Sequence, residues 1–506
     1  MLLEALIGLT LLGALITWLA PNDRAGVVAF LASLPPLVGS LWMYFAFDGS
    51  GNALLENGEV AFENEITWLT MGPIEVSWHV GVDGVSVPLI VLTTVLATTA
   101  IMSAWTPIKE RQSQFYGLVL LLEAALIGVF AALDFLLWFV FWEAVLVPMY
   151  FLISVWGGPR RKYAAIKFFV YTNVASLVMF IAFAALVFAL PVESFALPEI
   201  TQSLRAGELG DLGAIPAETL ELAAFVAIFA GLAVKVPVVP FHTWLPDAHV
   251  EAPTPVSVIL AGVLLKMGTY ALLRFNFTMM QDLAMDLAYP IAVFAVVSVL
   301  YGALLAMAQT DLKRIVAYSS VSSMGYVILG LVALTEFGLG GATFQMISHG
   351  LISGLLFMAV GVIYNQTHTR MVTDMSGLAD RMPITVGVFV AAAFAYMGLP
   401  LMSGFAAEVY VFIGAIDAFD GALYFTVAAM FGIVLVAGYL LYAMQRTLFG
   451  PFRLETEYEI SPASLHDVVP LLVLVGLIIL LGTFPQETIF EMIHDGVVDL
   501  ATGGVA

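Results

Sequence analysis

The chain has 506 residues, of which 61% are hydrophobic and 11% are charged, and its mean hydropathy is +1.00. This composition excludes a soluble globular domain and is typical of a protein that crosses a membrane many times. Cysteine is absent from the sequence, which excludes a disulfide framework and a thiolate-bound metal or iron–sulfur cluster in this chain.

Acidic residues outnumber basic residues by 38 to 17, which gives a formal net charge of -21. Residues 48–83 contain seven carboxylates and neither lysine nor arginine. Such a surplus suits a protein bathed in concentrated salt, where repulsion between charges is screened. Ordinary acidic external loops explain the composition equally well, so a halophilic source is one of two open interpretations.

Apolar runs of about 20 residues, separated by charged residues, proline and glycine, predict fourteen membrane spans. The predicted spans are 2–20, 26–47, 83–104, 114–132, 134–156, 163–190, 217–247, 254–274, 285–308, 313–334, 338–364, 383–416, 422–448 and 467–487. The first begins with Glu4 rather than a basic flank and has no small-residue cleavage pattern, which favours a span over a secretory signal. No short repeat is found, so residues 1–506 are predicted to form one polytopic, all-α membrane domain.

Two predicted spans cannot be continuous helices. The seventh contains Pro237 and Pro240, and the twelfth contains Gly398 and Pro400. Proline removes a backbone donor and clashes with the preceding turn, so each helix is expected to break. Broken helices at membrane depth are tolerated where the freed backbone groups line a hydrated cavity, and paired breaks suggest inverted repeats. We therefore predict two inverted five-helix repeats, residues 114–274 (spans 4 to 8) and 285–448 (spans 9 to 13).

The positions of the basic residues predict the orientation of the chain. Arg205 and Arg274 lie beside connections that follow even-numbered spans, and Lys235 and Lys266 lie inside spans. The other thirteen lie in or beside connections that follow odd-numbered spans: Arg24, Lys109, Arg111, Arg160, Arg161, Lys162, Lys167, Lys313, Arg314, Arg370, Arg381, Arg446 and Arg453. Because basic loops stay in the cytoplasm, both termini are expected on the extracytoplasmic side of the plasma membrane.

Among the charged residues inside predicted spans, we single out Glu123, Glu143, Lys235, Lys266 and Glu408 as candidates. A charge at membrane depth costs several kcal/mol and generally marks an ion or proton pathway. The alternative for Glu143 and Lys235 is a static buried ion pair, which often gives no net stability. The alternative for Lys266 or Glu408 is a long side chain that reaches the membrane surface.

Histidines lie between these charges along the sequence. His242 lies in the broken seventh span, His249 at its cytoplasmic end, and His349 in the eleventh span. An imidazole titrates near neutral pH and can pass a proton through either nitrogen, which suits a relay. A hydrogen-bonded helix contact is the alternative for each histidine, and no HExxH motif accompanies them to indicate a metal site.

Several of these segments resemble a known family. The runs FWEAVLVPMY, KVPVVPFHTWLPDAHVEAPTPVSVILAGVLLKMGTY, QTDLKRIVAYSSVSSMGY and ISHGLISGLLFMAVGVIYNQTHTR are similar to the antiporter-like M subunit of proton-pumping NADH:quinone oxidoreductase, respiratory complex I. The resemblance covers nearly the whole chain. It implies that Glu143 and Lys235 form a pair whose separation changes during pumping, that Lys266 is the central lysine, and that Glu408 lies at the exit.

The resemblance also places His242 and His349 on the hydrated axis between these groups. Glu408 favours the M subunit, because the sister L and N subunits typically carry lysine there. One position departs from the family pattern SxSHMG in span 10, where Ser323 stands in place of histidine. A hydroxyl can hold water but cannot store a proton near neutral pH.

Three functional classes are consistent with this sequence. The first is a proton-translocating subunit of a respiratory NADH (or related donor):quinone oxidoreductase, with flavin, iron–sulfur clusters and quinone in partner subunits and none in this chain. The second is a subunit of a multisubunit Na⁺/H⁺ antiporter, and the third is a membrane spacer without transport. The resemblance favours the first class, with L-like and N-like membrane subunits as neighbours and no role for nucleic acid.

Overall fold

The structure is a computed structural model that describes residues 1–56, 58–71, 74–456, 458, 460–461 and 463–501. Within these residues, thirteen helical segments are long and apolar enough to cross a membrane. They are α1 (Leu2–Leu19), α2 (Ala25–Ala46), α3 (Ser86–Ser103), α4 (Gln112–Ala131), α5 (Phe135–Ala144) with α6 (Leu146–Trp156), α7 (Arg161–Ala189), α9 (Ala217–Lys235), α11 (Thr254–Ile259) with η2 (Leu260–Leu264), α12 (Leu265–Ala271) and η3 (Leu272–Met279), α14 (Ala288–Met307), α15 (Leu312–Ala333), α16 (Glu336–Thr367), α19 (Ala422–Thr447) and α20 (Leu465–Thr483). The all-helical membrane fold expected from the sequence is confirmed.

The remaining elements are short. They are β1 (Ala61–Met71), β2 (Ile74–Val82), α8 (Leu197–Arg205), η1 (Phe241–Thr243), α10 (Trp244–Glu251), α13 (Gln281–Asp286), β3 (Met375–Ser376), η4 (Leu378–Asp380), α17 (Pro383–Tyr396), α18 (Ser403–Ala415), β4 (Arg453–Leu454), η5 (Gln486–Phe490), α21 (Glu491–Asp495) and α22 (Val498–Ala501). Helices α17 and α18 are each too short to be counted as a span, and together they make the twelfth predicted one. This split explains why fourteen predicted spans correspond to thirteen long segments.

Both predicted helix breaks are present. Helix α9 ends at Lys235, and the chain continues through the short 3₁₀ turn η1 into α10. Helix α17 ends at Tyr396, and α18 begins only at Ser403. Each break therefore follows directly after a polar side chain that points into the protein, since Lys235 and Tyr396 are both buried.

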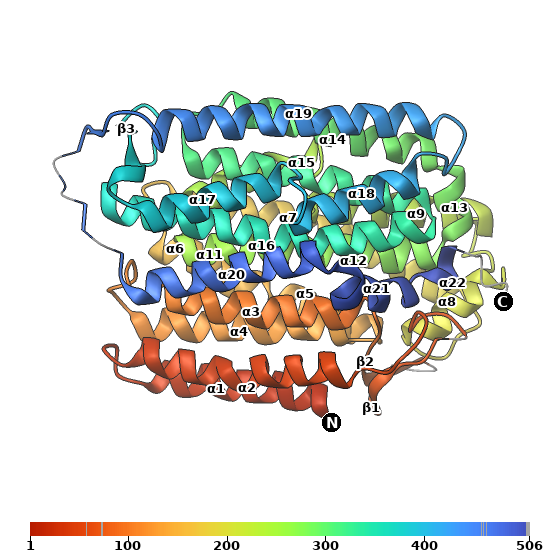
Figure 1. Cartoon of the computed structure of the whole chain (residues 1–506). Helices are drawn as coiled ribbons and strands as arrows, with labels where there is room; N and C mark the ends of the chain where they lie inside the picture. The colour runs from red at the N-terminus through yellow and green to blue at the C-terminus, as the bar shows by residue number, and fades with distance from the viewer. Residues whose placement is uncertain (57, 72–73, 457, 459, 462, 502–506) are drawn as a thin grey trace.

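The helices form layers, and the polar candidates lie in the inner ones. Helices α1 and α2 run along one edge of the molecule and α14 and α19 along the opposite edge (Figure 1). The most apolar stretches of α16 and of the segment 254–279 are completely buried inside the protein, whereas those of α7 and α20 are only 33% and 28% buried. Side chains on the inner helices are therefore screened from lipid by the outer ones.

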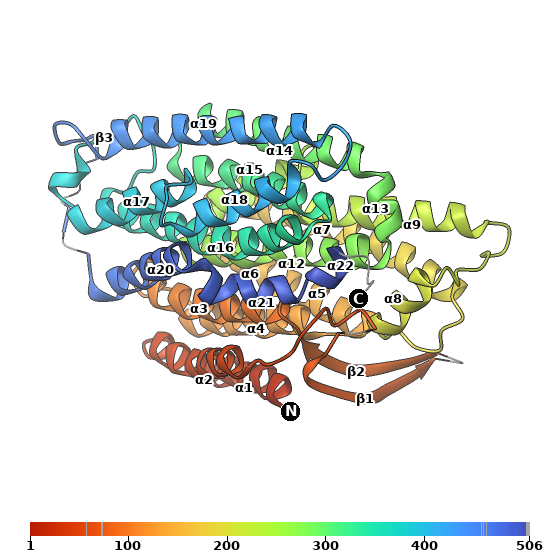
Figure 2. The same ribbon diagram turned by 45° about the vertical axis from the view of Figure 1, so that its right-hand side comes forward.

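A β-hairpin follows α2, where the sequence indicated only an acidic loop. Strands β1 and β2 pair antiparallel, with Met71 opposite Ile74, and Figure 2 shows the two strands at the edge of the bundle beside α8. Asp134 attaches it to α5, because its carboxylate accepts from the backbone N–H groups of Ser77 and Leu137, each at 3.0 Å. Burial raises the pKa of Asp134, and these backbone donors oppose the rise.

Candidate functional site

Lys266 is completely buried, on a helical segment that contains two π-helical stretches. These stretches, η2 and η3, flank α12, and π-helical insertions are frequent at functional sites. The ammonium of Lys266 donates to the carbonyl of Ala261 in η2 at 2.6 Å. It also lies 2.6 Å from Nδ1 of His349 on α16, and both side chains are almost completely buried.

This contact restricts the protonation states of the two groups. A charged lysine has only donors, so Nδ1 of His349 must accept and the imidazole is neutral, with its proton on Nε2. Nε2 has no hydrogen-bonding partner among the described residues. No described carboxylate bonds to Lys266, so a single proton can reside either on the amine or, through Nδ1, on the imidazole.

Glu143 and Lys235 approach each other without a direct bond. Asn173 donates to Oε2 of Glu143 at 3.1 Å, while Oε1 has no partner among the described residues. The ammonium of Lys235 has none either, and it lies 4.9 Å from the centre of the Trp142 ring. A cation over an indole face is stabilised by the ring quadrupole. The two side chains do not bond to each other, so the structure does not contain the closed ion pair that is the alternative for these residues.

Glu408 follows the second helix break and is 5% exposed. Its Oε2 has no hydrogen-bonding partner among the described residues. The break approaches this oxygen closely, because a Cβ atom placed on Gly398 would lie 3.0 Å from it. Gly398 has φ +70°, a left-handed conformation that glycine adopts without strain. The buried position of Glu408 differs from that of a side chain reaching the membrane surface.

The other candidate residues predicted from the sequence are also buried, and they have polar atoms without hydrogen-bonding partners among the described residues. His242 on η1 is 7% exposed, and its Nδ1 has no partner in the described part of the chain. Both carboxylate oxygens of Glu123 on α4 and both ring nitrogens of His249 on α10 are likewise unpartnered. The His249 ring stacks on Phe357 with 4.4 Å between ring centres. Buried polar groups usually find a partner, so these exceptions agree with the predicted proton pathway, which stays a prediction.

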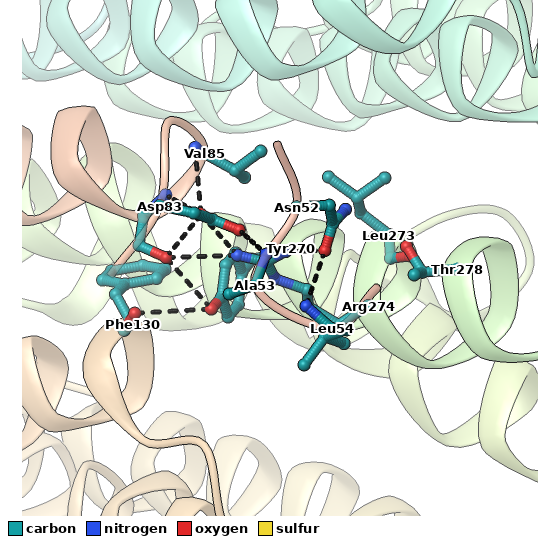
Figure 3. Close-up of polar contacts among 11 residues, drawn as sticks. Asn52, Ala53, Leu54, Asp83, Val85, Phe130, Tyr270, Leu273, Arg274 and Thr278 are labelled. Atoms are coloured by element: carbon teal, nitrogen blue, oxygen red, sulfur yellow. Dashed lines mark hydrogen bonds and ion pairs between the residues drawn. The ribbon is translucent and has the colours of Figure 1, made fainter. Parts of the chain in front are cut away.

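One buried charge cluster was not anticipated from the sequence. Arg274, at the end of the helical segment that carries Lys266, donates to Asp83 at 2.6 Å and to Asn52 at 2.9 Å. Figure 3 shows the guanidinium group between these two side chains. Asp83 also accepts from the backbone N–H groups of Ala53 and Val85, at 3.0 and 3.1 Å. Although burial alone raises the pKa of Asp83, the Arg274 charge and the backbone N–H groups of Ala53 and Ser86 lower it below its ordinary value.

Sequence reasoning missed this cluster because its members come from distant segments. Asp83 and Arg274 are 191 residues apart, and each was interpreted as part of an external connection. One signal was available in the sequence. Arg274 directly follows an apolar run, and it was placed on the same side of the membrane as residues 48–83, whose charged side chains are all acidic. The pair fastens the connection after the hairpin to the first turn of η3.

A second missed cluster lies at the ends of α7, α10 and α15. Asp247 accepts from Lys167 at 2.8 Å and pairs with Arg314 at 3.4 Å. Lys313 is 3% exposed and donates to the carbonyl of Ala252 at 2.5 Å. These contacts join helices of the two predicted repeats. No group of three or more metal-ligating side chains occurs among the described residues.

Comparison with known proteins matches a family described as "NADH:quinone oxidoreductase/Mrp antiporter, TM" to residues 132–436. The chain is 39% identical over 495 residues to NAD(P)H-quinone oxidoreductase chain 4 1 of Synechococcus elongatus, covering 96% of this chain and 89% of that relative. It is 37% identical over 507 residues to F(420)H(2) dehydrogenase subunit M of Methanosarcina mazei, covering 98% of each chain.

Solved structures are similar over almost the full length. Respiratory complex I from Thermus thermophilus with bound NADH contains a chain that matches with a TM-score of 0.87 and 26% identity, covering 99% of each chain. A chain of the Mrp complex from Dietzia sp. matches with a TM-score of 0.83 and 21% identity, covering 99% of this chain and 97% of that one. The second likeness concerns the fold alone.

Proposed function

The chain belongs to the NADH:quinone oxidoreductase/Mrp antiporter transmembrane family, and from this premise we propose that it is the M-like, proton-translocating membrane subunit of a quinone oxidoreductase. The observation that carries the proposal is the Lys266–His349 contact, in which a buried cation meets a neutral base. A charged lysine buried at this depth in a membrane is energetically costly. Transfer of its proton to the neighbouring imidazole neutralises the lysine and removes that cost.

Within this function we assign roles to the candidate residues. The candidate residues form a row, which is the proposed order of proton transfer. In this row Lys266 and His349 hold the central proton, and Glu408 receives it on the exit side. Glu143 and Lys235 form the opposite end of the row, and the distance between them sets the electric field there. Because each charge alters the field at the next within a low-dielectric interior, closing or opening the Glu143–Lys235 gap changes the proton affinity of Lys266.

His242 and Glu123 belong to the same row in this proposal. Each is buried and has an unpartnered polar atom, as a water-filled pathway requires. His242 lies beside the break after Lys235, where freed backbone groups can hold water. Glu123 supplies a second carboxylate on α4, next in the chain to the helix that carries Glu143.

Redox chemistry belongs to partner subunits in this assignment. Flavin, iron–sulfur clusters and quinone reside there. Electron transfer among them is coupled to this chain through changes in the charges of its buried residues. Its neighbours in the membrane are an L-like and an N-like antiporter subunit, the membrane is the plasma membrane, and both termini lie outside the cytoplasm. Residues 114–274 and 285–448 form two inverted repeats, and in each a broken helix precedes or carries a buried ionisable residue.

A multisubunit Na⁺/H⁺ antiporter is the second candidate, because the family description includes it. The relatives with 37% and 39% identity are named as oxidoreductase or dehydrogenase subunits, which favours the first candidate. The two candidate functions differ in what proton transport should depend on. A quinone oxidoreductase subunit supports proton transport that starts on quinone reduction, whereas an antiporter subunit supports transport that requires Na⁺ and no quinone.

The test is quinone-linked proton transport by the assembled complex in sealed vesicles. Glu143→Ala and Lys235→Ala are each expected to abolish most transport, while Glu143→Asp retains part of it because the carboxylate remains. Normal transport by either alanine variant would contradict the assigned roles. A spacer without transport predicts instead that Lys266→Ala pumps normally and affects assembly alone.

A further inference from the structure

Tyr396 carries a buried hydroxyl group and packs against His349, the residue that contacts Lys266. Tyr396 is the last residue of α17 before the break, and its side chain is 5% exposed. Its ring meets the His349 ring edge-on, with 5.8 Å between ring centres. Two residues further along, the break approaches the other titratable group, because a Cβ atom placed on Gly398 would lie 3.0 Å from Oε2 of Glu408. Tyr396 therefore packs against His349 and stands at the start of the break that approaches Glu408.

Ser323 on α15 determines which way the phenol can donate. Its hydroxyl donates to the phenolic oxygen of Tyr396 at 3.0 Å. The phenolic oxygen acts as the acceptor in this bond, so its own proton is available for a second partner. Ser323 thus positions Tyr396 as a donor.

The two groups that the pathway must connect each have a buried atom without a hydrogen-bonding partner among the described residues. These atoms are Nε2 of His349 and Oε2 of Glu408. Buried polar atoms of this kind commonly bind ordered water, and a water can bridge a polar contact at little cost. A proton donor, a neutral hydroxyl and an acceptor are therefore available near the break after α17.

We propose that the Tyr396 hydroxyl relays protons between His349 and Glu408, with Ser323 as its positioning residue. The phenolic oxygen accepts a proton from the His349 side while its own O–H proton leaves toward the Glu408 carboxylate. The imidazolium becomes imidazole, the carboxylate becomes carboxylic acid, and the phenol is neutral before and after. This inference rests on the proposed proton translocation and names the group that completes its central step.

Tyr396→Phe tests the relay, because it keeps the ring against His349 and removes only the hydroxyl. We expect quinone-linked proton transport by the assembled complex to fall at least about tenfold, since positioned proton-transfer groups contribute on the order of a hundredfold or more. Tyr326→Phe is the matched control. Tyr326 is a buried tyrosine on the same helix as Ser323, and its hydroxyl donates to a backbone carbonyl, that of Ala429, at 3.1 Å. Its removal is expected to leave transport within about twofold of wild type.

Ser323→His in the Tyr396→Phe background separates a relay from a packing effect. An imidazole at position 323 supplies a new titratable group beside the empty hydroxyl position, so we expect at least half of the lost transport to return. Wild-type transport by Tyr396→Phe, an equal loss in Tyr326→Phe, or no recovery in the double variant would each overturn the relay.

Transport by Lys266→Ala, measured alongside the Tyr396 variants, distinguishes failure of the relay from failure of the proposed function. Normal transport by Lys266→Ala would contradict the proposed function itself. Loss of transport in Lys266→Ala together with normal transport in Tyr396→Phe would overturn the relay alone. The amount of assembled complex, measured on native gels, normalises every rate.

Discussion

Lys266 and Arg274 are buried cations on one continuous helical segment, yet their surroundings differ completely. Arg274 meets an aspartate, an asparagine and a serine hydroxyl, so it is neutralised and bound on several sides. Lys266 meets a backbone carbonyl and an imidazole, neither of which carries a negative charge. The difference teaches that burial alone does not identify a functional charge. A cation with a carboxylate partner is fixed, whereas a cation against a neutral base can release its proton.

Lys266→Met gives the largest expected effect and tests the functional half of this comparison. Methionine has a similar length and no charge, so proton transport by the assembled complex is expected to fall by more than tenfold. Thermal stability of the purified complex is expected to stay the same or rise, because an unpaired buried charge has been removed. Loss of assembly with normal transport per complex would instead place Lys266 in the same class as Arg274.

Arg274→Ala tests the structural half. It leaves Asp83 buried without its counter-charge, which costs about 3–5 kcal/mol in comparable ion pairs. We expect less assembled complex and a lower unfolding temperature, with transport per assembled complex within about twofold of wild type. The double variant Arg274→Met with Asp83→Asn removes both charges and keeps an acceptor for the backbone donors, so it should regain most of the stability. A double variant as unstable as Arg274→Ala would show that the charges themselves are needed.

The pH dependence of stability sharpens the same distinction. The folded-state pKa of Asp83 is lowered, so its contribution is complete above the ordinary aspartate value of 3.8 and is lost as pH falls through the lower folded value. Wild-type stability should therefore show no contribution from Asp83 titration between pH 5 and 7. In Arg274→Met, burial without a counter-charge raises the pKa, so stability should increase as pH falls over that interval. Thermal unfolding of both proteins at pH 5, 6 and 7 measures this, and parallel curves would contradict the assignment.

Asp134→Ala is expected to give the smallest effect. Asp134 is a buried carboxylate that backbone N–H groups satisfy, so it is a third case between the paired and the unpaired charges. Loss of such a helix cap costs about 0.5–2 kcal/mol. Asp134→Asn keeps the acceptor oxygen, and asparagine and aspartate are nearly equal as helix caps. Its free energy of unfolding should therefore stay within about 0.5 kcal/mol of wild type. Unfolding curves of the two variants provide the comparison, and an equal loss in both would point to the charge instead of the cap.

Much of the fold could be predicted because lipid imposes a simple rule on sequence. Apolar runs of sufficient length gave the spans, and Pro237 and Pro400 placed both helix breaks, since proline cannot continue the backbone hydrogen bonding. The hairpin could not be predicted in the same way. Its strands are stabilised by packing and by Asp134, a residue more than fifty positions further along the chain.

The ionisable candidates were identified individually, whereas their partners were not. A charge inside an apolar run is visible in sequence, which is why Lys266 and Glu408 stood out. Their environments depend on tertiary contacts: His349 is 83 residues from Lys266, and Tyr396 is 73 residues from Ser323. A tyrosine at the end of an apolar helix resembles any other membrane-interface aromatic, so nothing local indicated that its ring packs against His349.

The most direct test of the account is an experimental structure of the assembled complex at a resolution that shows ordered water. The account predicts a connected series of waters that joins Glu143, Lys235, Lys266 and Glu408, with one water between Nε2 of His349 and the Tyr396 hydroxyl. Dry apolar packing between these four groups, or side chains directed at lipid, would contradict it.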